Sequence, residues 1–153
     1  MRRDFRPETT RNTLNYENIT LTLSQPDLFS FSRRLDTAHS AGHAGIGGMN
    51  DDLYAGNGDP AFYFHHAQVD HIWTIWQAQN LEERLEQVTG TLTISNSKWL
   101  SELVCDSMID IRVGPPSANG TLDTTMDLGY NGGMYAIRDL VSTIDGPFCY
   151  IYE

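Results

Sequence analysis

Apolar and aromatic side chains recur at helical spacing between residues 60 and 80. The recurring positions are Phe62, Val69, Ile72, Trp73 and Trp76, and their spacing fits one face of an α-helix. Asp59 supplies an N-cap carboxylate, and Pro60 suits the first helical position. We therefore predict a central helix from residue 60 to about residue 80, with Trp73 and Trp76 packed in the core.

A second, shorter helix is predicted just upstream. Asp36 is a good N-cap residue, and residues 37–45 could form two helical turns. Gly45, Gly47 and Gly48 then interrupt the helix and begin a glycine-rich loop that reaches Gly58. Gly47 and Gly48 permit a tight turn over the end of the helix.

The rest of the chain shows weaker patterns. Pro7 and Pro26 interrupt the first 30 residues, where we expect a lead-in with at most a short helix after Pro26. Residues 81–88 suggest an extension of the central helix, as a charged turn or a second segment. Residues 92–94 suggest a short extended piece and residues 114–129 a loop. Residues 135–143 are helix-like, and residues 147–152 are expected to form a strand or an extended tail. The predicted fold is mainly α, with long irregular loops.

Length and composition limit the classes of protein that fit. The chain has 153 residues, 40% of them hydrophobic, and a formal net charge of −10, which fits one acidic domain. Such a charge repels nucleic acid and anionic lipid, so neither is an expected partner. No apolar run approaches the roughly 20 residues of a membrane span. The two cysteines, Cys105 and Cys149, leave the redox compartment open.

All five histidines lie between residues 39 and 71. His39 and His43 are four residues apart, so their imidazoles point from one helix face, and a third imidazole from the next helix would complete a three-nitrogen metal site. Neutral imidazole suits copper, zinc, iron and nickel. A zinc protease would need a glutamate where Ser40 stands. The alternative is that the pair consists of ordinary helix-surface residues.

The sequence surrounding these histidines carries two specific motifs. Residues 59–77 read DPAFYFHHAQVDHIWTIWQ and resemble the second copper-binding motif of the tyrosinase and catechol oxidase family, DPxFxxHHxxxDxxWxxWQ. Residues 39–49, which contain HSAGH and GGM, are similar to that family's HxxxH and GGxM element. The tail from Gly146 to Glu153 resembles the end of short fungal members. The resemblance identifies the chain as a partial tyrosinase copper-binding domain, residues 1–153, carrying the half called CuB of a four-helix bundle.

The resemblance also implies roles for individual residues. His39, His43 and His66 would bind the copper called CuB, and His65 would support the site. Consecutive helical residues diverge by about 100° and cannot easily face one ion, which agrees with giving His65 and His66 different roles. Phe62 and Phe64 would wall the site, Met49 would pack beside it and His71 would lie on the surface. Asp70 would either accept a hydrogen bond from an imidazole or pair with an arginine.

The family's activity requires two coppers, each held by three histidines, which bind dioxygen and oxidise an ortho-diphenol to an ortho-quinone. Six imidazoles are needed and the chain has five, so the partner expected for an oxidase is an N-terminal half that carries the copper called CuA. The alternative is a module that binds one metal without turnover. Ser40 and Ala44 follow the first two ligands and predict a preference for small diphenols or ortho-aminophenols over monophenols. The resemblance to short fungal members also suggests secretion, which would make the sequons at Asn18 and Asn119 usable.

Overall fold

The computed structural model describes residues 2–92 and 118–153 and divides into two units. The first unit comprises Met1–Arg84 together with Tyr152. The second comprises Leu85–Ile151 together with Glu153. The described part is mainly helical, which confirms the predicted fold class.

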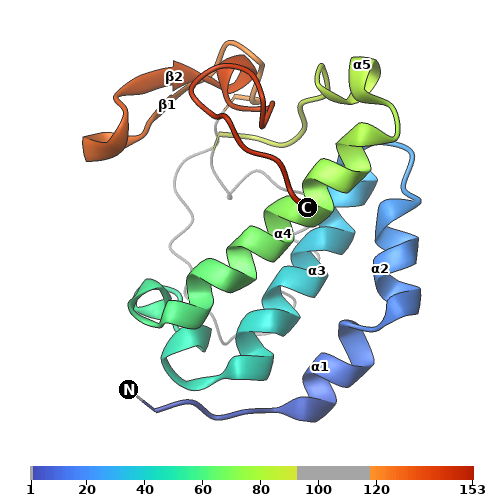
Figure 1. Ribbon diagram of the computed structural model, residues 1–153, viewed down its shortest axis with the longest axis vertical. Helices are drawn as coiled ribbons and strands as arrows, with labels where there is room; N and C mark the ends of the chain where they lie inside the picture. The colour runs from blue at the N-terminus through green and yellow to red at the C-terminus, as the bar shows by residue number, and fades with distance from the viewer. Residues whose placement is uncertain (1, 93–117) are drawn as a thin grey trace. The chain divides into compact units, whose positions relative to one another are not determined.

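Two long antiparallel helices, α3 (Leu28–Ile46) and α4 (Pro60–Ala78), form the centre of the first unit. They lie side by side, and the colour gradient in Figure 1 runs in opposite directions along them. Phe31 near the start of α3 stacks on Trp76 near the end of α4, with ring centroids 4.4 Å apart. This arrangement brings the end of α3 and the start of α4, where the histidines lie, close together.

An aspartate caps each long helix. Asp59 accepts a hydrogen bond from the Ala61 amide at 2.9 Å, and α4 confirms the predicted central helix. Asp27 caps α3 by accepting from the Ser30 amide at 2.8 Å. The predicted start of this helix after Asp36 was therefore wrong. The N-cap is Asp27 instead, and Phe31 and Leu35 extend the buried face of the helix upstream of Asp36.

The first 30 residues are also more helical than predicted. They form α1 (Pro7–Thr13) and α2 (Tyr16–Leu23), both beside α3 in Figure 1. Pro7 begins α1 as its first residue rather than interrupting a helix. Asn15 begins α2 by accepting a hydrogen bond from the Asn18 amide at 2.9 Å. The short helix α5 (Leu81–Arg84) follows α4.

The core of the first unit lies between α3 and α4. Its buried members are Leu28, Phe31, Leu35, Ile72 and Trp76, with Ile19, Leu23, Val69 and Trp73 packed against them. Trp76 is fully buried, and its indole N–H donates to the Gln25 carbonyl at 2.8 Å. Both tryptophans thus contribute to packing, as predicted from the apolar spacing.

The chain leaves α3 through a sharp turn at Gly47 and Gly48, which have φ values of 63° and 60°. A Cβ atom at Gly47 would lie 2.2 Å from the Asp4 carbonyl oxygen, and one at Gly48 would lie 2.1 Å from that of Arg2. Both glycines are needed for backbone conformation and for the close passage of the N-terminal segment. Two 3-10 turns, Gly48–Asp51 and Gly56–Gly58, then lead into α4.

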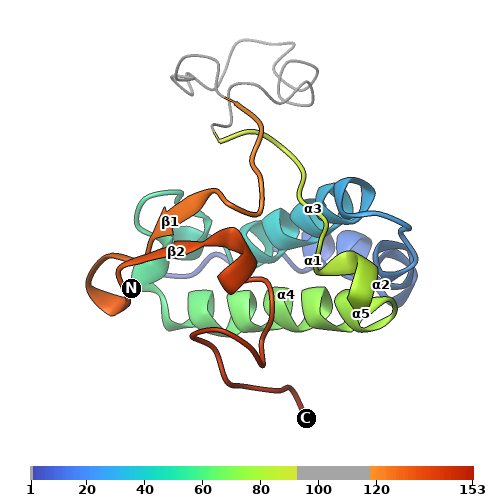
Figure 2. The same ribbon diagram turned by 90° about the horizontal axis from the view of Figure 1, so that it is seen from above.

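The second unit contains a small antiparallel hairpin of β1 (Thr125–Asp127) and β2 (Met134–Ala136), seen from above in Figure 2. Met126 pairs with Tyr135. The predicted helix over residues 135–143 was wrong, because Tyr135 and Ala136 belong to β2 and only a 3-10 turn, Ile137–Asp139, follows. The Asp139 carboxylate accepts from the Ala136 amide and terminates the strand.

Some predictions fall on residues that the structure leaves undescribed. Cys105, the end of the extended piece at residues 92–94 and the start of the loop at 114–129 lie outside the described residues. Cys149 is an exposed free thiol. Among the described helices, none is both long and apolar enough to cross a bilayer.

Candidate metal centre

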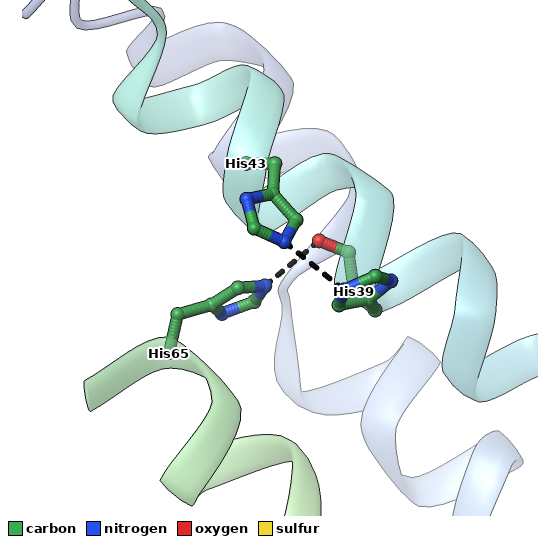
Figure 3. A group of neighbouring side chains, drawn as sticks. All are labelled: His39, His43 and His65. Atoms are coloured by element: carbon green, nitrogen blue, oxygen red, sulfur yellow. Dashed lines mark hydrogen bonds between the residues drawn. The ribbon is translucent and has the colours of Figure 1, made fainter. Parts of the chain in front are cut away.

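The last two turns of α3 and the first two turns of α4 present four imidazoles to one another. His39 and His43 lie one turn apart on α3, and His65 and His66 are consecutive on α4. All four are half-buried. Figure 3 shows His39 and His43 projecting from α3 towards His65 on α4.

The Nε2 atom of His39 lies close to the same ring atom of two other histidines. The Nε2 atom of His39 lies 3.0 Å from Nε2 of His43 and 3.1 Å from Nε2 of His66. Nitrogens bound to one ion at about 2.0–2.1 Å in tetrahedral geometry are about 3.3 Å apart. The observed separations are therefore close to those of a three-imidazole metal site.

The opposite nitrogen of each ring has its own hydrogen-bond acceptor. Nδ1 of His43 lies 2.7 Å from the Asn50 carbonyl oxygen and 3.0 Å from its side-chain oxygen. Nδ1 of His66 lies 2.8 Å from the Phe62 carbonyl oxygen, and Nδ1 of His39 lies 3.4 Å from the Asp36 carboxylate. A proton on Nδ1 satisfies each contact, which leaves a lone pair on Nε2. Lone pairs that face one another at these distances repel unless a cation or a shared proton lies between them.

His65 makes a different set of contacts. Its Nε2 lies 2.8 Å from the His39 carbonyl oxygen, to which the neutral ring donates. Its ring packs so tightly against α3 that a Cβ atom at Gly42 would lie 2.1 Å from its Cε1 atom. Burial lowers the pKa of His65 to about 4, and hydrogen bonding to His39 only partly opposes this. His65 is therefore a neutral ring that joins the two helices.

Two histidine triads are thus compatible with a metal ion. Ring nitrogens of His39, His43 and His65 lie within 4.8 Å of one another. The Nε2 atoms of His43 and His66 each lie within 3.1 Å of Nε2 of His39, and Nε2 of His66 is free of any backbone acceptor in the described contacts. Burial lowers the pKa of His66 and thereby favours the neutral, metal-binding form.

A pocket of about 350 Å³ opens onto the second triad. Its lining includes His39, His43 and His66, together with Ser40, Phe62 and the loop of residues 50–53. His65 instead lines a separate cavity of about 230 Å³ on the apolar side of α3 and α4. The larger pocket is therefore lined by His39, His43 and His66 but not by His65.

Other predicted site residues have mixed outcomes. The centroid of the Phe62 ring lies 4.0 Å from that of the His66 ring, and Phe62 lines the pocket. Phe64 does not line this pocket and is 79% exposed, since it stands two residues from Phe62 and projects from another side of α4. The Asp70 carboxylate accepts from the Tyr152 hydroxyl. Burial, and then this hydrogen bond, raise the pKa of Tyr152 to about 12.

The structure also corrects the prediction for His71 and adds residues that the sequence did not reveal. His71 stacks on Tyr152 with centroids 4.5 Å apart and is half-buried rather than a plain surface residue. Asn50 orients His43 and is 1% exposed. Asp36 lies inside α3, where its carboxylate contacts His39, and it does not cap the helix. This contact could have been predicted from the sequence, because Asp36 stands three residues before His39 and the two therefore share one helix face.

The fold and the donor set define a class of site: neutral imidazoles presented from antiparallel helices, with the chemistry of a copper or zinc centre. The family model described as the common central domain of tyrosinase matches residues 1–79. The chain therefore belongs to the tyrosinase family, and copper is the metal that the family implies.

Relatives and a solved structure agree with this membership. The chain is 57% identical over 62 residues to the tyrosinase-like protein orsC of Emericella nidulans, covering 40% of this chain and 17% of that protein. It is 36% identical over 114 residues to the oxidase hkm6 of Aspergillus hancockii, covering 74% and 34%. A mutant polyphenol oxidase from Thermothelomyces thermophila superposes with a TM-score of 0.79 at 28% identity, covering all of this chain and 41% of that one. The chain thus spans less than half the length of these relatives.

Proposed function

We propose that the chain provides the CuB site of a type 3 copper oxidoreductase, which oxidises ortho-diphenols or ortho-aminophenols to ortho-quinones with dioxygen. In this proposal His39, His43 and His66 are the copper ligands. The observation that carries it is that Nε2 of His39 lies 3.0 Å from Nε2 of His43 and 3.1 Å from Nε2 of His66, while the Nδ1 atom of each ring faces another acceptor. His65 is assigned a supporting role because its Nε2 atom is engaged by the His39 carbonyl.

The side chains of the site have defined tasks in this proposal. Copper, when bound, supplies one-electron redox chemistry, so quinone formation, which removes two electrons, needs two coppers. Asn50 and the Phe62 carbonyl hold the rings of His43 and His66 so that Nε2 faces the pocket. The Phe62 ring gives a flat apolar wall against which a phenol ring can stack.

The pocket favours diphenols over monophenols in our proposal. Ser40 lines it beside His39, and its hydroxyl can donate or accept one hydrogen bond but holds a water less rigidly than an amide would. A monophenol must lose its proton before it binds a metal, whereas a diphenol has a second hydroxyl to assist. We therefore propose that Ser40 is less effective than an amide side chain would be in helping a water to deprotonate a monophenol.

The second copper would require three further imidazoles. The sequence holds five histidines in all, and His71 stacks on Tyr152 rather than joining the cluster. We propose that an N-terminal CuA half completes the oxidase from outside these 153 residues. The second candidate is a module that binds one metal without turnover, which the presence of a single complete triad favours.

Histidine variants test the ligand set. His66→Ala should lower copper affinity by about 100-fold or more, since loss of a residue that merely supports a ligand already costs about 10–100-fold. His65→Ala should cost less, and His71→Ala, a matched removal of a histidine from the same helix, should leave affinity unchanged. The measurement is competitive copper titration. Copper loss in His65→Ala with retention in His66→Ala would contradict the assignment.

Oxygen consumption separates the two candidate functions. The copper-loaded chain alone should consume no dioxygen with catechol, while addition of a CuA half should start consumption. Failure of every such addition, with copper bound to both parts, would favour the mononuclear module.

A further inference from the structure

The loop that closes one side of the site pocket is acidic. Asp51 and Asp52 both belong to the pocket lining, and no lysine or arginine is among the described residues that line it. A charged substrate would therefore meet these carboxylates on its way to the imidazoles. Their effect depends on which of the two charges is already compensated.

Asp51 has a cationic partner. Its carboxylate lies 3.1 Å from the guanidinium of Arg6, which also lies 3.3 Å from Asp4. Arg6 does not line the pocket, so it offsets the charge of Asp51 from the outer side. Asp51 therefore contributes little net charge to the pocket.

Asp52 is held in a different way. One carboxylate oxygen accepts from the backbone amides of Tyr54 and Ala55, both at 2.8 Å. These hydrogen bonds, first that from Ala55 and then that from Tyr54, lower the pKa of Asp52. No lysine or arginine pairs with Asp52 in the described part of the chain. The result is a fixed, ionised carboxylate at an exposed edge of the pocket.

Resting on the function proposed for the site, we propose that Asp52 makes this pocket prefer ortho-diphenols whose ring bears a cationic ammonium side chain over those that bear a carboxylate. The diphenol oxygens would face the imidazoles, and the side chain would lie towards the loop of residues 50–53. An ammonium group there is attracted by Asp52, and a carboxylate is repelled.

The expected size of this selectivity follows from the exposure of Asp52. Exposed ion pairs change affinity by about two- to fivefold, so attraction and repulsion together give a ratio of about tenfold between cationic and anionic diphenols. The ratio should shrink as salt is added, because the screening length falls to about 3 Å at 1 M.

The test uses the full chain loaded with zinc, which binds imidazole but does not oxidise the probe. The probes are 4-methylcatechol, a catechol with an aminoethyl side chain and a catechol with a carboxyethyl side chain. Calorimetric titration should give dissociation constants that rise in the order aminoethyl, methyl, carboxyethyl.

Two charge-matched variants assign the effect to one carboxylate. Asp52→Asn retains an oxygen for the Tyr54 and Ala55 amides and should reduce the aminoethyl to carboxyethyl ratio to about two or less, with little change for 4-methylcatechol. Glu17→Gln removes one exposed negative charge from α2, outside the pocket, and should keep the wild-type ratio.

The outcomes distinguish this proposal from the function on which it rests. Equal binding of all three catechols, tighter binding of the carboxyethyl probe, or no catechol binding by the metal-loaded chain would overturn the selectivity while leaving the metal site intact. An unchanged ratio in Asp52→Asn would do the same. A chain that takes up neither zinc nor copper would overturn the proposed function and this inference with it.

Discussion

Each imidazole of the proposed triad is oriented by a group that is not itself a metal donor. Asn50 contacts Nδ1 of His43 with both its carbonyl and its side-chain oxygen, and the Phe62 carbonyl contacts Nδ1 of His66. These contacts fix the tautomer as well as the ring direction. Hydrogen bonds to the Nδ1 atoms, on the far side of each ring, therefore set the direction of the Nε2 atoms.

Gly42 provides the close helix approach on which this arrangement depends. We predict that Gly42→Ala destabilises the protein by up to about 2 kcal/mol, because overpacking costs about 1–3 kcal/mol and the helix propensity of alanine returns about 1 kcal/mol. The physical cause is the new methyl group, which would lie 2.1 Å from Cε1 of His65. Urea unfolding measures the change.

A double variant provides the control for this prediction. Gly42→Ala combined with His65→Ala removes the clashing ring, so the two costs should not add. Additive costs would show that the ring of His65 does not limit how closely α3 and α4 approach.

At the residue scale, the sequence pointed to the proposed metal donors but not to Asn50 and Gly42, which support them. His39, His43 and His66 carry a strong spacing signal, whereas Asn50 and Gly42 contact histidines through the folded chain. Asn50 meets His43 only because the turn at Gly47 and Gly48 brings the loop back over α3. No short stretch of sequence indicates that this loop brings Asn50 to His43.

At the scale of elements, capping aspartates and stripes of apolar residues decide where the two long helices begin. Asp59 caps α4 and also forms a two-point ion pair with Arg3, with distances of 2.8 and 3.0 Å. The side-chain hydrogen bond from Arg3 is the main cause that lowers the pKa of Asp59, followed by the Ala61 amide. One carboxylate thus joins the N-terminal segment to the helix that carries His66.

We predict that Asp59→Asn destabilises the protein at pH 7 and that the difference from wild type shrinks as the pH falls below about 4. The folded-state pKa is lowered, so the stabilisation is complete above the unfolded pKa and is lost as the pH falls through the folded pKa. Asparagine keeps the capping acceptor but loses the charge. Urea midpoints at pH 7 and pH 3 measure the effect.

Asp27→Asn is the matched control, because Asp27 is the exposed cap of the other long helix. Asp27→Asn keeps the capping oxygen and removes no described ion pair, so it should change stability less than Asp59→Asn at pH 7. A cost for Asp59→Asn that is equal at both pH values would show that the ion pair with Arg3 contributes nothing.

Element boundaries were less predictable than element types. The start of α4 could be read from Asp59 and Pro60, but Asp36 resembled a cap and lies inside α3. Residues 135–143 had a helical apolar spacing, yet pairing of Tyr135 with Met126 placed their start in a strand. Competing caps and strand partners are settled by tertiary contacts, which a single stretch of sequence does not contain.

At the scale of the whole molecule, the chain supplies one complete triad and spans less than half the length of its matched relatives. The histidine count indicated one metal site, and the structure brings the predicted ligands together in the first unit. The sequence did not predict the small hairpin of the second unit, because its short strands give little periodic signal.

Pulsed electron paramagnetic resonance of the chain loaded with Cu(II) tests the central claim most directly, because it counts the nitrogens bound to the metal. We predict one copper per chain coordinated by three imidazoles, with one imidazole signal lost in His66→Ala and none lost in His71→Ala. Copper bound by fewer than two imidazoles, or a signal unaffected by His66→Ala, would contradict the account.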